Sequence, residues 1–143
     1  MVDREARNRI AEATRHFVAG LSTNFEFDDS VWAISTTDRG VKEIRWALWT
    51  LYSDFRTHKL KPTDELQEVA ARILLFLKSD CEYSWPAVPR WYPPVRALLC
   101  LLSLDRARHR LDAKYRDMAV WPFLSVSEAD VAREHPRYLA GSV

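Results

Sequence analysis

Apolar residues recur at helical spacing over much of this chain, and this pattern predicts a protein built from helices. The first predicted helix covers residues 3–19. Its apolar face is formed by Ile10, Ala13, Phe17 and Leu21. Gly20 follows the helix directly, and a glycine there commonly ends a helix because it adopts left-handed backbone angles without strain.

The next stretch, residues 22–37, has no clear helical period. Residues 25–28 (Phe-Glu-Phe-Asp) alternate as a strand would, but the chain offers no second strand to pair with them. We therefore expect a connector that contains one turn of helix at residues 30–34.

Two amphipathic helices are predicted next, over residues 39–57 and 64–79, with Asp38 and Thr63 as their N-caps. The apolar face of the first comprises Val41, Ile44, Leu48, Leu51, Tyr52 and Phe55. The apolar face of the second comprises Leu66, Val69, Ala70, Ile73 and Leu77. The run 73–77 is apolar on all sides, so we expect this end of the helix to be central in the fold.

The second half of the chain begins with a loop at 80–94 that is rich in aromatic residues and proline. A fourth helix is predicted over 94–118, and its apolar first half is expected to begin in the core. A short last helix follows a capping-box pattern at Ser127 and ends before Pro136. The prediction is a single all-α domain over residues 1–143, a compact bundle of four main helices plus a short C-terminal helix.

Composition narrows the possible functions. Twenty-one basic and 20 acidic residues give a net charge of +1, which argues against nucleic acid as the partner because phosphate binding needs a basic excess. Only three glycines are present, so no glycine-rich phosphate loop is expected. The longest apolar stretch, 95–104, is half the length that a membrane helix needs, about 20 residues. The charged N-terminus lacks a secretory signal, and we expect a cytoplasmic protein.

The two cysteines, Cys81 and Cys100, do not make a disulfide framework. Cys100 lies within the leucine run 98–102. We expect it to be a buried free thiol, because an unpaired cysteine in such a run behaves as a small apolar side chain.

Acidic residues and one histidine are the strongest candidates for catalysis. Asp54 and His58 are four residues apart and would share a helical face, while Asp80 and Glu82 follow the third helix. If the second and third helices are antiparallel, Asp80 approaches the far end of the second helix, which argues against one compact site. We assign no metal ligands and no cofactor.

At a helical rotation of 100° per residue, Trp46 and Trp49 point away from the apolar face of the second predicted helix. Either the 80–94 loop, Trp121 and Phe123 cover them, or they form an exposed aromatic patch for a partner. The candidate partner-binding residues are Trp46, Trp49, Trp85, Trp91 and Trp121, since tryptophan is enriched at binding hot spots.

Two functional classes follow from these observations. The first is a non-enzymatic protein-interaction module, such as an immunity or accessory protein, which binds another protein through its aromatic surface. A homodimer through the Trp46 and Trp49 face is an alternative form of the same idea. The second is a small metal-dependent hydrolase that uses the acidic candidates with His58.

Overall fold

The computed structural model describes residues 1–52, 55–61, 63–85, 90–104, 106–107, 110–111 and 120–134. Within these ranges the regular structure is helical, and the one bridge of β type joins Thr23 to Lys59. The helices are α1 (Arg4–Val18), α2 (Asn24–Trp32), α3 (Arg39–Trp49), α4 (Asp64–Lys78), α5 (Tyr92–Leu101) and α7 (Val126–Glu134). The predicted all-α fold is confirmed.

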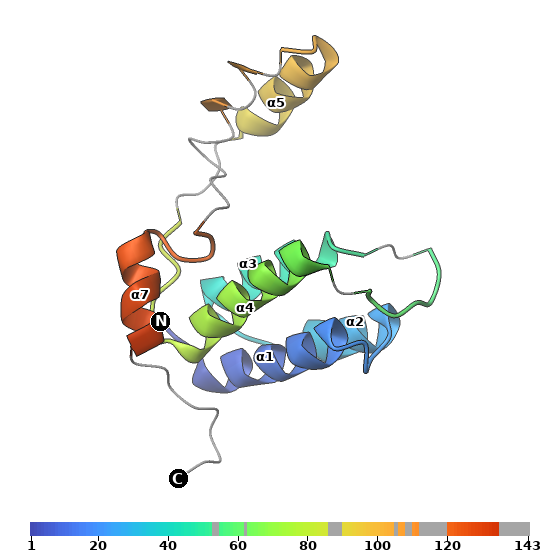
Figure 1. Cartoon of the computed structure of the whole chain (residues 1–143), viewed down its shortest axis with the longest axis vertical. Helices are drawn as coiled ribbons and strands as arrows, with labels where there is room; N and C mark the ends of the chain where they lie inside the picture. Colours follow the sequence, from blue (N-terminus) through green and yellow to red (C-terminus); the bar gives the residue numbers. More distant parts are fainter. Residues whose placement is uncertain are drawn as a thin grey trace.

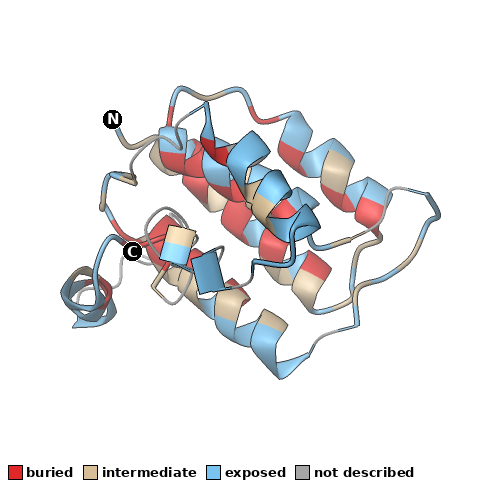
Figure 2. Cartoon of the chain, turned by 90° about the horizontal axis from the view of Figure 1, so that it is seen from above, coloured by how far each residue is buried: buried red, intermediate tan, exposed pale blue. Residues whose placement is uncertain are grey.

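The body of the protein is built around α1 and α4, which lie side by side (Figure 1). Helices α2 and α3 pack on this pair, and α7 packs on α4 near the N-terminus. Buried residues face inward between these helices, and their outer faces are exposed (Figure 2). The core includes Ile10, Phe17, Phe27, Ile44 and Phe76.

The ends of α1 and α4 agree with the sequence signals. Gly20 has a φ of 69°, and its amide donates to the Phe17 carbonyl, so it ends α1 as predicted. The side chains of Asp38 and Thr63 accept backbone N–H groups at the starts of α3 and α4. Each cap satisfies a donor that the helix itself leaves unpaired.

The predicted connector over 22–37 is wrong, because α2 occupies Asn24–Trp32. Its N-terminus carries a complete capping box: Thr23 accepts from the Glu26 amide, and the Glu26 carboxylate accepts from the Thr23 amide at 2.8 Å. Phe27 is buried and stacks on Phe17 with ring centroids 4.4 Å apart. Local capping and this tertiary contact together outweigh the weak helical period.

Helix α3 begins at the predicted residue but ends at Trp49 rather than at 57. Thr50 follows as the C-cap, and its hydroxyl donates to the Ala47 carbonyl at 2.7 Å. A threonine hydroxyl that bonds a carbonyl in the preceding turn competes with helix continuation. As a result, Phe55 of the predicted apolar face is almost fully exposed.

Helix α5 departs furthest from expectation. It lies away from the body (Figure 1) and packs against none of the other described helices. The expected burial of its first half is therefore wrong, and Cys100 is exposed rather than buried. The helix ends at Leu101, and Ser103 follows with a φ of 52°, so the predicted single helix to 118 is interrupted at this turn. Residues 106–107 and 110–111 are again helical. Residues 105, 108–109 and 112–118 of that prediction lie outside the described residues.

Two tryptophans fasten the segment before α5 to the segment after it. Trp85 Nε1 donates to the Phe123 carbonyl at 3.0 Å, and Trp121 Nε1 donates to the Tyr83 hydroxyl at 3.1 Å. Trp121 is buried, and burial of Tyr83 raises the pKa of its hydroxyl. The chain segments before and after α5 are thereby joined to each other at the body of the protein.

The last helix, α7, starts one residue before the predicted Ser127, and Ser125 rather than Ser127 serves at its N-terminus. Ser125 Oγ accepts from the Glu128 amide at 3.2 Å, and the Glu128 carboxylate accepts from the Leu124 amide at 2.7 Å. The predicted serine cap is present, displaced by two residues, but the Glu128 carboxylate bonds the amide before the capping serine, so the capping box is incomplete.

A buried ion pair links three helices. Arg7 of α1 is fully buried and donates to the Asp38 carboxylate at 2.7 Å and to the Ser79 carbonyl at 2.9 Å. Burial alone would raise the pKa of Asp38. Hydrogen bonds from Arg7 and from the Asp3 amide outweigh burial, and the pKa of Asp38 falls below its ordinary value. The pair therefore stays charged within the core.

Candidate functional site

An exposed cluster of three tryptophans lies where α2 and α3 meet. Trp46 and Trp49 of α3 are 52% and 39% exposed, and Trp32 at the end of α2 is exposed to a similar degree. The Trp46 ring contacts Trp32 and Trp49 edge to face, with centroid distances of 5.0 and 5.7 Å. We call Trp32, Trp46 and Trp49 the tryptophan surface.

Polar contacts fix the Trp32 side of this surface. The Arg45 guanidinium stands over the Trp32 ring, with its carbon 4.2 Å from the ring centroid. Trp32 Nε1 donates to the Asp28 carboxylate at 3.2 Å, and the Tyr52 hydroxyl donates to the same carboxylate. Such contacts reduce the freedom of the rings before any partner binds.

The alternative in which Trp46 and Trp49 are covered is wrong. Trp85 and Trp121, the expected cover, instead bond to Phe123 and Tyr83. Their position follows from these hydrogen bonds and from burial of Trp121, so neither belongs to the tryptophan surface. Trp91, the N-cap of α5, is exposed, and α5 lies away from the helices that carry the cluster (Figure 1).

His58 does not lie on a helix, because α3 ends nine residues earlier. Its backbone is held by Asn24. The Asn24 N–H donates to the His58 carbonyl at 3.0 Å, and the His58 N–H donates to Asn24 Oδ1 at 2.9 Å. Asn24 Nδ2 also donates to the Arg56 carbonyl at 3.2 Å. His58 therefore occupies a segment tied to the start of α2, and the predicted shared helical face with Asp54 is wrong. Asp54 itself lies outside the described residues.

The remaining acidic candidates lie at the opposite end of the body. Asp80 forms an ion pair with Arg4 at the start of α1, and Glu82 pairs with the N-terminal amine at 3.0 Å. His58 is tied to Asn24, beyond the other end of α1, so about 20 Å of helix separates it from Asp80. No group of three metal-binding side chains occurs in the part of the chain that the structure describes.

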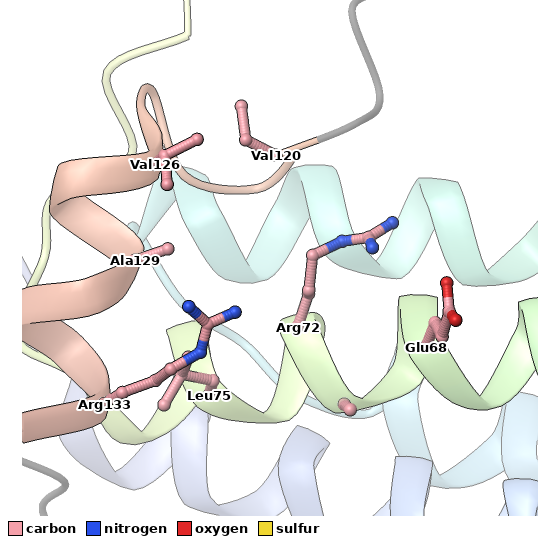
Figure 3. Close-up of a pocket in the computed structure, with 8 residues that line it drawn as sticks. Glu68, Arg72, Leu75, Val120, Val126, Ala129 and Arg133 are labelled. Atoms are coloured by element: carbon pink, nitrogen blue, oxygen red, sulfur yellow. The ribbon is translucent and has the colours of Figure 1, made fainter.

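A groove of about 460 Å³ lies between α4 and α7 (Figure 3). Leu75, Val126 and Ala129 give it an apolar lining, and Arg72 and Arg133 project from the two helices. Both arginines already have partners within the chain. Arg72 Nε donates to the Trp121 carbonyl at 3.4 Å, and Arg133 pairs with Asp130. We assign the groove no ligand.

Sequence reasoning missed Trp32 and Arg45 as members of the exposed site. Trp32 was missed because α2 was not predicted. The signal that could have found α2 is Thr23 followed three residues later by Glu26, the spacing of a capping box. Arg45 carries no comparable signal, since its position over Trp32 depends on how α2 and α3 pack.

Comparison of the chain with known proteins gives no indication of its function. No protein-family model, no curated protein and no solved structure matches the chain. Among the described residues, no helix combines the length and the apolar character needed to cross a membrane.

Proposed function

We propose that this protein is a non-enzymatic interaction module that binds another protein through the tryptophan surface. The observation that carries the proposal is the contiguous exposure of Trp32, Trp46 and Trp49 beside Arg45. Tryptophan and arginine are the residue types most enriched among binding hot spots. An immunity or accessory protein that acts in the cytoplasm would use such a surface.

The arrangement of the rings supports this use. Each ring is braced by an edge-to-face neighbour, and Trp32 is also held by Asp28 and Arg45. A rigid aromatic anchor loses little conformational entropy on binding, so more of its interaction energy contributes to affinity. The hydrolase alternative has less support, since His58 and Asp80 stand at opposite ends of α1.

The test compares the full chain with three single variants. Proteins captured from a lysate of the source cells by the wild type are compared with those captured by Trp46→Ala, Trp49→Ala and the control Leu124→Ala. Leu124 is exposed and lies outside the tryptophan surface. A purified captured protein is then titrated calorimetrically against each variant.

We expect both tryptophan variants to weaken binding by about 30-fold or more, the effect of losing a hot-spot residue, and the control to bind as the wild type does. Thermal unfolding should change much less than for a buried tryptophan, because both side chains are partly exposed. The buried Trp121 provides the contrast: Trp121→Ala should lower stability by about 3–5 kcal/mol. Equal capture by all variants would reject the proposal.

A further inference from the structure

One stripe of α3 combines exposed aromatic rings with positive charge. At a helical rotation of 100° per residue, its members fall within a sector of about 100°. We call this group the α3 stripe, and it consists of Lys42, Arg45, Trp46 and Trp49. Arg45 is half-buried, and the other three side chains are exposed. Glu43, the one acidic residue of α3, lies about 60° or more outside the stripe. The stripe therefore offers hydrogen-bond donors and no carboxylate.

The two indole N–H groups of the stripe have no acceptor in the described part of the chain. Trp46 Nε1 and Trp49 Nε1 donate to no other described residue, whereas Trp32 Nε1 donates to Asp28. A tryptophan N–H that becomes buried almost always has a hydrogen-bond partner. A partner that covers these rings must therefore bring acceptors with it.

The two cations of the stripe also lack carboxylate partners. Arg39, on the same helix, pairs with Glu43 at 4.0 Å. Among the described residues, Lys42 and Arg45 form no such ion pair. The Arg45 guanidinium stands over a tryptophan ring and donates to the Ile34 carbonyl at 3.4 Å, so its charge is not matched by an acid. Positive charge beside an apolar surface is complementary to a partner that carries carboxylates.

The α2 edge of the tryptophan surface has the opposite charge. Asp28 and Asp29 lie four and three residues before Trp32, on the same side of α2. Asp28 accepts from Trp32 Nε1 and from the Tyr52 hydroxyl, and Asp29 is exposed. Nucleic acid presents negative phosphates along its whole length, so these two carboxylates would repel it. A protein segment can place acidic residues at one edge only.

We propose that the partner of the tryptophan surface is a protein segment that places carboxylates on the α3 stripe and apolar side chains against the rings. An ionised carboxylate only accepts hydrogen bonds and has two oxygens. It can therefore accept from the indole N–H groups as well as from Lys42 and Arg45. Hydrogen bonds with one ionised group are also stronger than bonds between neutral groups. This inference rests on the proposed function and specifies the chemistry of the partner.

The first test selects short random peptides from a display library against the full chain. The selection is repeated with Trp46→Ala and with Trp49→Ala, and far-UV circular dichroism checks that each variant is folded. Peptides that bind the wild type and neither variant are ligands of the tryptophan surface. We expect Asp and Glu to outnumber Lys and Arg in these peptides, beside aromatic residues or leucine. Neutral or basic peptides would overturn this inference and leave the proposed function standing. A selection without any peptide that requires the tryptophans would reject both.

Charge variants test the contact itself, with the most enriched peptide labelled for fluorescence anisotropy. Lys42→Glu should weaken its binding about fivefold, the effect of reversing one exposed charge, and Asp29→Asn should strengthen it. The matched control is Lys61→Glu, which makes the same change at an exposed position in the connection between α3 and α4 and should bind within about twofold of the wild type. Equal affinities for the Lys42 and Lys61 variants would overturn the proposal. So would a thymidine oligonucleotide that binds the wild type more tightly than the peptide and fails to bind Trp46→Ala.

Discussion

Replacing Arg7 tests the buried link between α1, α3 and α4. We expect Arg7→Met to lower the free energy of unfolding by about 3–5 kcal/mol, the usual cost of removing one partner of a buried ion pair. Methionine keeps most of the apolar stem of arginine, so the loss reports the guanidinium group more than an empty space.

The magnitude follows from the groups that Arg7 leaves behind. The Asp38 carboxylate would stay buried with only the Asp3 and Gly40 amides as donors, at 3.0 and 2.8 Å. The Ser79 carbonyl would lose one donor at 2.9 Å but keep Arg4 Nη2 at 2.7 Å, so most of the cost falls on the carboxylate; a buried group that loses its partner costs about 1–3 kcal/mol. The guanidinium also stands 4.7 Å from the centroid of the Phe76 ring, a contact worth about 1–2 kcal/mol when desolvated. These contributions overlap, so the total stays near the value for a broken pair.

Urea unfolding at neutral pH, followed by far-UV circular dichroism, measures the change as a shift of the midpoint at constant slope. The matched control is Arg133→Met, which removes the same charge from an exposed pair with Asp130 and should cost less than about 1 kcal/mol. A loss below about 1 kcal/mol for Arg7→Met, or equal losses for the two variants, would refute the reasoning.

Two further predictions concern the start of α3. The folded pKa of Asp38 lies below the ordinary 3.8, so its stabilisation is complete above that pH and is lost as the pH falls through the folded value. Asp38→Asn should therefore flatten the loss of stability below about pH 4 in acid titrations of the urea midpoint, and an unchanged slope would contradict this. Gly40→Ala would stabilise an open helix by up to about 1 kcal/mol. Here the added methyl would lie 2.9 Å from Phe76 Cε1 and 3.2 Å from Asp38 Oδ1, so thermal unfolding should show a loss of about 1–3 kcal/mol, and a gain would count against the packing described.

The sequence was sufficient where local chemistry decides the structure. The caps at Asp38 and Thr63, and the glycine end at Gly20, act within one helical turn, and the structure has all three. The end of α3 was not predictable in the same way. Its apolar period continues past Trp49, but the chain leaves the helix at Thr50.

Burial of whole elements was harder to predict than their existence. The leucines of α5 were expected in the core because the helix is apolar on all sides, yet the helix lies away from the body. The direction of Trp46 and Trp49 followed from helical spacing. Their exposure depended on where Trp85 and Trp121 found hydrogen-bond partners, which is a long-range property that spacing does not contain.

The Arg7 contacts also set an order of events during synthesis. Arg7 leaves the ribosome 31 residues before Asp38 and 72 residues before Ser79, its two principal hydrogen-bond partners. At typical elongation rates of 5–20 residues per second, the first helix waits roughly 4–14 s for the end of α4. During that interval its apolar face and its arginine lack their native contacts with α4, so the nascent chain offers chaperones a binding segment that the finished protein hides.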